Sequence, residues 1–237
     1  MVGTFFIQYI FVAIFNNKYY HNINLYDVIN TIEYQNKLNN YINNHTLLIL
    51  FITVLIFLPI FFCLYKKYKS NIKLSINKVL FCILLGIIIS LTYNLYLSII
   101  TNYQISKLPI LVQIISSGII GPILEELLFR GIIYNKLKEF NSTNKAMIIS
   151  TIIFAIMHST ITDFIYTLFI GYILVYIYES YKNIKYPIIM HISANISVIL
   201  LSIIISLNIY MLNIILFILC LIILFYLYYK KIVKNIL

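Results

Sequence analysis

The stretch that decides how this 237-residue chain folds lies near its middle. It reads Ser117-Gly118-Ile119-Ile120-Gly121-Pro122-Ile123-Leu124-Glu125-Glu126-Leu127-Leu128-Phe129-Arg130-Gly131. Its aliphatic residues suit the interior of a lipid bilayer, yet two adjacent glutamates and one arginine lie among them. A charged residue at the centre of a membrane helix costs about 2.5–3.5 kcal/mol or more, so such residues tend to be functional. We therefore interpret this stretch as a membrane-spanning helix that carries a functional site.

The composition of the whole chain supports a membrane protein. It is 62% hydrophobic and only 10% charged, whereas soluble domains carry about 25% charged residues. Its mean hydropathy is +0.96. These values exclude a soluble globular domain, a disordered tail and a nucleic-acid partner, despite a net charge of +10. The apolar runs are continuous and do not alternate, which excludes a transmembrane barrel. We predict an all-α multi-pass transmembrane helical bundle that forms a single membrane domain over residues 1–237.

The apolar runs set the number of expected spans, because a spanning helix needs about 20 apolar residues. Seven runs meet this requirement or come close to it: 46–65, 79–100, 108–134, 146–161, 163–181, 187–208 and 209–229. Thr4–Phe15 is a shorter run that forms either an eighth, tilted helix or an interfacial one. The sequence therefore predicts seven or eight spans. Residues 16–45 form a polar, Asn-rich connection between this run and the first long span.

The lysines predict the orientation of these spans, since basic residues concentrate in cytoplasmic loops. If the 66–78 loop is cytoplasmic, alternation of the spans places thirteen lysines inside and only three outside. The lysines outside are Lys18, Lys37 and Lys107. We therefore expect a cell-membrane protein with a cytoplasmic C-terminus and an extracytoplasmic 16–45 connection.

Two of the three charged residues of the middle helix are spaced to form an ion pair, and the third is not. Glu126 and Arg130 stand at i and i+4, a spacing at which two side chains meet on one helical face. Glu125 points about 100° away around the helix. Such a pair is often only a structural salt bridge in soluble helices, but inside a membrane the cost of burial favours function. We predict that Glu126 pairs with Arg130 and that Glu125 is a candidate general base.

Two histidines occupy later spans, each with a notable residue one turn away. Phe154 and His158 share one helical face, and His191 and Asn195 share another. A single intramembrane histidine is as often a packing residue as a catalytic one, and Phe154 is expected to be a packing residue. The cysteines Cys63, Cys82 and Cys220 lie in apolar runs without metal-ligand spacing and are expected to be buried hydrophobic residues.

Taken in order, Glu125-Glu126-x-x-x-Arg130, Phe154-x-x-x-His158 and His191-x-x-x-Asn195 resemble the motifs of the CPBP family. This family comprises CAAX proteases and bacteriocin-processing (Abi) proteins, and it includes the type II CAAX-prenyl endopeptidases. The resemblance covers about residues 108–208, which would form the catalytic core. It implies an intramembrane endopeptidase that hydrolyses a peptide bond in a small peptide or a membrane-anchored protein.

The resemblance also implies a role for each motif residue. Glu125 would activate water with help from His158, and Arg130 would support the two glutamates. His191 and Asn195 would donate hydrogen bonds to the oxyanion of the tetrahedral intermediate, as such a site requires. A cavity that opens toward the cytoplasm would admit the substrate.

Three alternatives stay open at the level of sequence. An ion-coupled membrane transporter also buries charge in its helices, although the inverted repeats common in transporters are not evident here. A non-catalytic membrane scaffold or immunity protein is a further possibility. Glu125, His158 and His191 could also bind a catalytic zinc ion. Because Arg130 lies one turn from the glutamates and would repel a divalent cation, we instead predict an enzyme that needs no cofactor or metal.

Overall fold

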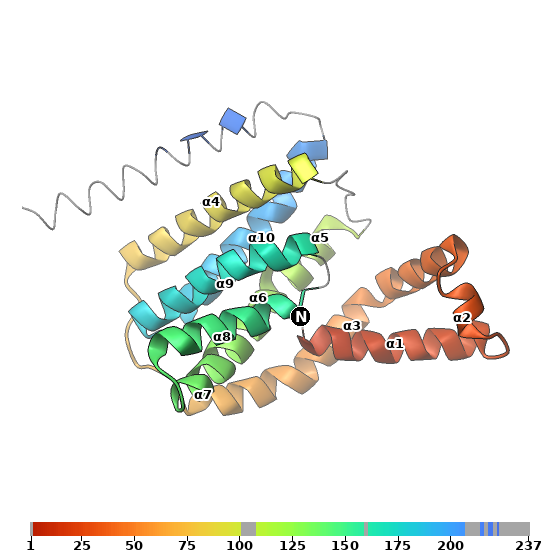
Figure 1. The fold of residues 1–237 in the computed structure, drawn as a ribbon, viewed down its shortest axis with the longest axis horizontal. Helices are drawn as coiled ribbons and strands as arrows, with labels where there is room; N and C mark the ends of the chain where they lie inside the picture. Colours follow the sequence, from red (N-terminus) through yellow and green to blue (C-terminus); the bar gives the residue numbers. More distant parts are fainter. Residues whose placement is uncertain are drawn as a thin grey trace, which may run out of the picture.

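The computed structural model describes residues 2–100, 108–158 and 161–206, and isolated positions 214–215, 218–219 and 222 beyond them. No strand occurs among these residues, and the predicted all-helical class is confirmed. The described helices, shown in Figure 1, are α1 (Val2–Tyr20), α2 (Leu25–Val28), α3 (Ile32–Lys66), α4 (Ile76–Ile100), α5 (Ile110–Gln113), η1 (Ile114–Ile120), α6 (Gly121–Glu126), η2 (Leu127–Tyr134), α7 (Asn135–Lys138), α8 (Thr143–Ile156), α9 (Ile161–Tyr181) and α10 (Lys185–Ser206).

Five helices within the described residues are long and apolar enough to cross a membrane. They lie at Ile32–Lys66, Ile76–Asn94, Ile110–Lys138, Ile161–Tyr181 and Lys185–Ser202. The third of these is continuous from α5 through η1, α6 and η2 to α7. The expected span at 146–161 is instead the shorter apolar helix α8, which ends at Ile156. The expected span at 209–229 and the C-terminal tail lie outside the continuously described residues.

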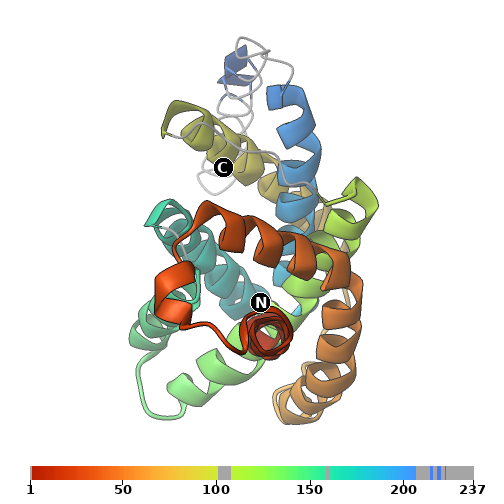
Figure 2. The same ribbon diagram turned by 90° about the vertical axis from the view of Figure 1, so that its right-hand side faces the viewer.

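The N-terminal arm is more helical than the sequence suggested. The polar 16–45 segment holds the end of α1, the short helix α2 and the first turns of α3. α3 begins at residue 32 because the Thr31 hydroxyl accepts a hydrogen bond from the Tyr34 amide, which is a typical N-cap. Ile7 and Phe11 of α1 are buried against Ile49 of α3. α1 and the N-terminal part of α3 therefore form an arm that projects from the remaining helices (Figure 1), which Figure 2 shows from the side of the arm. The C-terminal part of α3 packs against the bundle through Phe61 and Tyr65.

The core of the bundle depends on the close approach of α4 and α10, which run side by side (Figure 1). At Gly86 of α4, an added Cβ atom would lie only 2.5 Å from the Met190 carbonyl oxygen of α10. The Ser193 hydroxyl of α10 also donates a hydrogen bond of 2.8 Å to the Ile83 carbonyl of α4. Small and hydroxyl-bearing residues are typical of helix contacts in membranes, where they let backbones approach.

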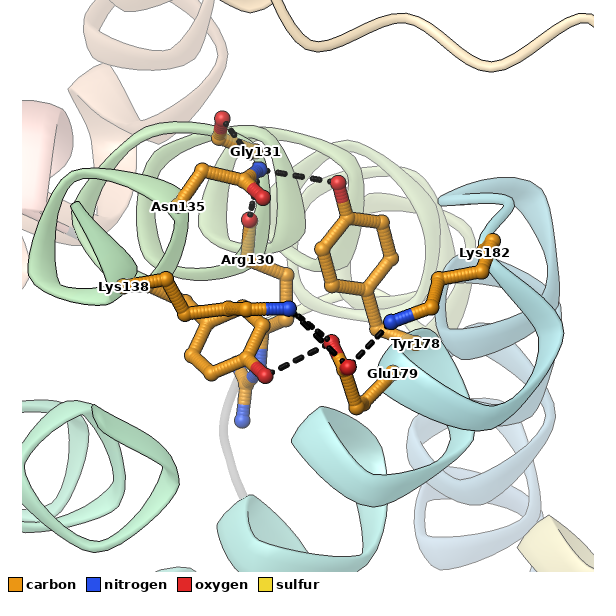
Figure 3. A network of polar contacts seen from close by, with 8 residues as sticks. Arg130, Gly131, Asn135, Lys138, Tyr178, Glu179 and Lys182 are labelled. Atoms are coloured by element: carbon orange, nitrogen blue, oxygen red, sulfur yellow. Dashed lines mark hydrogen bonds and ion pairs between the residues drawn. The ribbon is translucent and has the colours of Figure 1, made fainter. Parts of the chain in front are cut away.

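Ion pairs gather at the end of the bundle that carries the lysine-rich loops. Glu139 accepts hydrogen bonds from Lys136, Lys67 and the Tyr68 hydroxyl, and these bonds lower the pKa of Glu139 to about 2. Glu179 of α9 accepts hydrogen bonds from Lys138, Lys182 and the Tyr134 hydroxyl, as Figure 3 shows in part. These contacts join the ends of α3, α7 and α9 on one side of the protein.

The topology predicted from the lysines can be tested by labelling in intact cells. In a cysteine-free background, Tyr26→Cys should react with a membrane-impermeant maleimide, because Tyr26 is 90% exposed and the predicted topology places its arm outside the cell. Lys73→Cys lies in the lysine-rich loop and should react only after the cells are permeabilised. Strong labelling of Lys73→Cys in intact cells would reverse the orientation.

The contact at Gly86 predicts a cost for the smallest possible side chain. Gly86→Ala should lower the free energy of unfolding by about 1–3 kcal/mol, the usual cost of overpacking, because the new methyl group meets rigid backbone. Thermal unfolding in detergent measures this change. Leu84→Ala on the same helix is the control, since Leu84 is 48% exposed and points away from α10. Wild-type stability of Gly86→Ala would contradict the packing described.

Candidate active site

The helix that carries the two glutamates is wound unusually. Two π-helical stretches, η1 and η2, flank the single α-helical segment α6 that ends at Glu126. π-helical turns are rare and frequently occur at functional sites. At the far end of η2, the Asn135 side-chain amide donates to the carbonyl oxygens of Arg130 and Gly131 and contacts the Tyr178 hydroxyl (Figure 3). Asn135 thereby donates hydrogen bonds to backbone carbonyl oxygens at the point where the π-helical stretch η2 ends and the α-helix α7 begins.

The predicted pair of Glu126 and Arg130 is present and fully buried. Arg130 Nη1 donates to Glu126 Oε1 at 2.9 Å, and both side chains have 0–1% exposure. Arg130 Nη2 donates to the Gly171 carbonyl of α9 at 2.9 Å. The guanidinium carbon also lies 4.5 Å from the centroid of the Phe154 ring, a cation–π distance. The arginine therefore ties its own helix to α8 and α9.

His191 of α10 lies between the two glutamates. Its Nδ1 is 2.9 Å from Glu126 Oε1, and its Nε2 is 3.7 Å from Glu125 Oε2. The sequence did not predict this contact, because 65 residues separate His191 from Glu126 and no spacing rule connects them. Since Nδ1 faces a carboxylate, it is assigned as a proton donor to Glu126. Nε2 is then the ring atom of His191 that faces Glu125.

His158 follows directly after the end of α8. Its Nδ1 lies 3.1 Å from the Phe154 carbonyl oxygen. Because a carbonyl only accepts, Nδ1 is assigned the ring proton and Nε2 an acceptor lone pair in the neutral imidazole. Phe154 is 1% exposed, and its ring centroid lies 5.0 Å from that of His158 and 6.1 Å from that of His191. Phe154, which we expected to be a packing residue, thus contacts both histidines and Arg130 and holds them in place.

Asn195 is positioned by a contact that the sequence did not indicate. Its side-chain amide donates to the Ser117 carbonyl of η1 at 2.9 Å. His191 and Asn195 lie one turn apart on α10 as predicted, but in this structure each makes its hydrogen bond to the middle helix. Their common role as oxyanion donors stays a prediction.

A cavity of about 290 Å³ joins these side chains. It is lined by Glu125, His158, His191 and Asn195, and also by Ser117, Tyr93, Asp163 and Tyr166. Glu126 and Arg130 do not line the cavity and lie behind its wall. The structure thus brings four of the six predicted residues to one cavity and places the other two beneath it.

The cavity does not lie where we expected it. We expected an opening toward the cytoplasm, which the lysine-rich loops mark. Three lining residues instead lie at the opposite ends of their helices: Tyr93 late in α4, Asp163 at the start of α9 and His158 just past α8. Two others, Glu125 and His191, lie nearer the middle of the bundle and the lysine-rich end. Because α8 has only 14 residues, it reaches about 21 Å from the lysine-rich end. On the predicted topology, the cavity extends from the middle of the bundle toward its extracytoplasmic side.

The geometry of the cavity bears on the alternative of a zinc site. In the part of the chain that the structure describes, no three His, Cys, Asp or Glu side chains are arranged to hold a metal ion. Glu125, His158 and His191, the ligands of the alternative zinc site, are therefore not arranged as a metal-binding group among the described residues. His191 Nδ1 is already engaged with Glu126, which is in turn paired with the buried Arg130 cation.

Comparison with known proteins finds a family model and two curated relatives. Residues 107–197 match the family model of type II CAAX prenyl endopeptidases, Rce1-like. The chain is 36% identical over 90 residues to the protein named "Putative membrane peptidase YdiL" of Bacillus subtilis (strain 168), which is 38% of this chain and 37% of that protein. It is 35% identical over 94 residues to the UPF0177 protein YxdF of Lactococcus lactis subsp. lactis (strain IL1403), which is 38% of this chain and 50% of that protein.

These matches cover half or less of each curated relative, and no solved structure matches the chain. The matched segment nevertheless contains Glu125, Glu126, Arg130, His158, His191 and Asn195. The resemblance predicted from the motifs is confirmed, because residues 107–197 match the model of Rce1-like type II CAAX prenyl endopeptidases.

Proposed function

We propose that this protein is an intramembrane endopeptidase that hydrolyses a peptide bond within the cavity lined by Glu125, His158 and His191. The observation that carries the proposal is the different environment of the two adjacent glutamates. Glu126 is bound by Arg130 and His191 beneath the cavity wall. Glu125 lines the cavity itself. The salt bridge between Glu126 and Arg130 does not require Glu125. The activation of a water molecule in the cavity does require a carboxylate there, and Glu125 supplies it.

The proposed reaction begins with a water molecule between Glu125 and His158. Glu125 accepts a proton from this water, and the His158 Nε2 lone pair orients it. The water oxygen forms a bond to the carbonyl carbon of the substrate, and the carbonyl π electrons move to its oxygen. Collapse of this intermediate breaks the carbon–nitrogen bond, and the proton held by Glu125 passes to the departing amine. No metal ion enters this sequence of steps.

The developing oxyanion needs hydrogen-bond donors, which His191 and Asn195 supply in this proposal. Asn195 lines the cavity while its amide binds the Ser117 carbonyl. An amide nitrogen carries two hydrogens, so one can stay with Ser117 while the other reaches the substrate. His191 Nε2 can donate only when the ring also carries a proton at that atom. In this proposal His191 donates from a doubly protonated ring, and Glu125 remains a carboxylate that can accept the proton of the water.

The substrate is proposed to be a small peptide or the extracytoplasmic end of a membrane-anchored protein. A cavity of about 290 Å³ is near the lower limit of ligand pockets, so it accommodates a few residues of an extended peptide. Three lining residues, Tyr93, His158 and Asp163, lie at the helix ends away from the lysine-rich loops, which favours access from the extracytoplasmic leaflet. On this account the lipid bilayer is the second partner.

Replacement of the proposed base should remove activity without unfolding the protein. We expect Glu125→Gln to reduce cleavage of membrane-anchored reporter peptides by about 10²–10⁴-fold or more, because general base catalysis contributes about that much. His158→Ala should have an effect in the same range. Asp27→Asn is the matched control, since Asp27 is exposed on the N-terminal arm. Turnover near the wild-type rate in Glu125→Gln would show that another group activates the water.

The absence of a metal from the proposed mechanism is also testable. Elemental analysis of the active, detergent-purified protein should find far less than one zinc ion per chain. Exhaustive chelation should leave peptide cleavage unchanged, because no step depends on a metal. If activity disappears on chelation and returns when zinc is added, the metal-free mechanism is wrong.

A further inference from the structure

The wall of the cavity formed by α4 and α9 carries a second acidic group. Asp163 lies in the first turn of α9, where the partial positive charge of a helix N-terminus favours an ionised carboxylate. The Tyr93 hydroxyl of α4 donates to Asp163 Oδ1 at 2.6 Å. The ring of Tyr93 packs on that of Tyr166, with centroids 4.1 Å apart. An acidic group and two aromatic rings therefore face one region of the cavity.

Tyr166 adds an observation that points to a ligand. Its hydroxyl oxygen is buried and has no hydrogen-bond partner among the described residues, although the residue lines the cavity. Buried hydroxyl groups are nearly always satisfied by a partner. A bound molecule with a polar hydrogen beside the Tyr166 oxygen would complete this site.

The charge of the cavity indicates which kind of molecule that is. Among the described residues of its lining there are two carboxylates, Glu125 and Asp163, and no lysine or arginine. Arg130 is buried beneath the wall against Glu126 and does not face the cavity. An ammonium or guanidinium group would donate hydrogen bonds to Asp163 and Tyr166 and would lie against aromatic rings. A neutral isoprenoid chain would satisfy neither polar group.

We propose that Tyr93, Asp163 and Tyr166 form a specificity subsite that binds a lysine or arginine side chain of the substrate, close to the bond that is cleaved. This inference rests on the proposed endopeptidase function and names its substrate class: a cationic peptide. Asp163 supplies the charge, Tyr166 completes its hydrogen bonding with the ligand, and Tyr93 positions the Asp163 carboxylate.

Binding to an inactive protein tests the subsite without requiring cleavage. The probes are apolar peptides with a photoreactive group, in which one lysine is moved from position to position, and matched peptides with norleucine in its place. Against Glu125→Gln protein in detergent, the best lysine peptide should bind about tenfold more tightly than its norleucine partner, in line with a desolvated cation contact. Asp163→Asn should reduce this preference to about twofold or less, although its amide oxygen can still accept from Tyr93.

Two further variants separate charge from structure. Tyr93→Phe removes the hydrogen bond that positions Asp163 but leaves the carboxylate, so the lysine preference should weaken less than in Asp163→Asn. Tyr166→Phe retains the ring and should weaken the preference. Equal binding of lysine and norleucine peptides, or a lysine preference that survives Asp163→Asn, would overturn the subsite.

Cleavage assays separate an error in the proposed cationic subsite from an error in the proposed endopeptidase function. Glu125-dependent cleavage of neutral and cationic peptides at equal rates would leave the endopeptidase standing and remove the cationic subsite. Lysine-dependent binding that Asp163→Asn abolishes, without cleavage of any peptide, would leave the subsite standing and remove the endopeptidase.

Discussion

The buried ion pair between Glu126 and Arg130 is the constraint on which the rest of the site depends. Two charges removed from water cost several kcal/mol each unless good geometry and further hydrogen bonds compensate them. Here the compensation comes from three other helices: the Gly171 carbonyl of α9, the Phe154 ring of α8 and His191 of α10. Each of these contacts stabilises one of the two buried charges. The positions of α8, α9 and α10 around the middle helix therefore depend on the Glu126–Arg130 pair.

This constraint gives the two adjacent glutamates different roles. Glu126 is held in place by a cation and an imidazole, so its carboxylate serves to position His191. Glu125 lies one residue earlier, on the cavity side of the same α-helical segment, where it faces His191 Nε2 at 3.7 Å. The π-helical stretches on either side and the short helix α8 bring His158 into the same cavity. Phe154 completes the arrangement, because it contacts both histidines and the arginine.

The sequence predicted the parts of this arrangement that depend on local spacing. The i, i+4 rule identified the Glu126–Arg130 pair, and hydropathy identified the helices. It could not show that His191 bridges the two glutamates or that Asn195 binds Ser117, because these contacts join separate spans. The cytoplasmic opening was inferred without knowing that α8 stops after 14 residues. The sequence did not single out Asp163, which the fold places beside Tyr93 and Tyr166.

The most direct test of the central constraint is a double-mutant cycle between Glu126 and Arg130, measured as the free energy of unfolding in detergent. Glu126→Gln and Arg130→Met each leave a buried charge without its partner, and each should cost about 3–5 kcal/mol. The double variant leaves neither charge, so its loss should fall short of the sum of the single losses by about 1–3 kcal/mol, as for residues in one network. Single losses that add within about 0.5 kcal/mol, as they do for independent sites, would contradict the account.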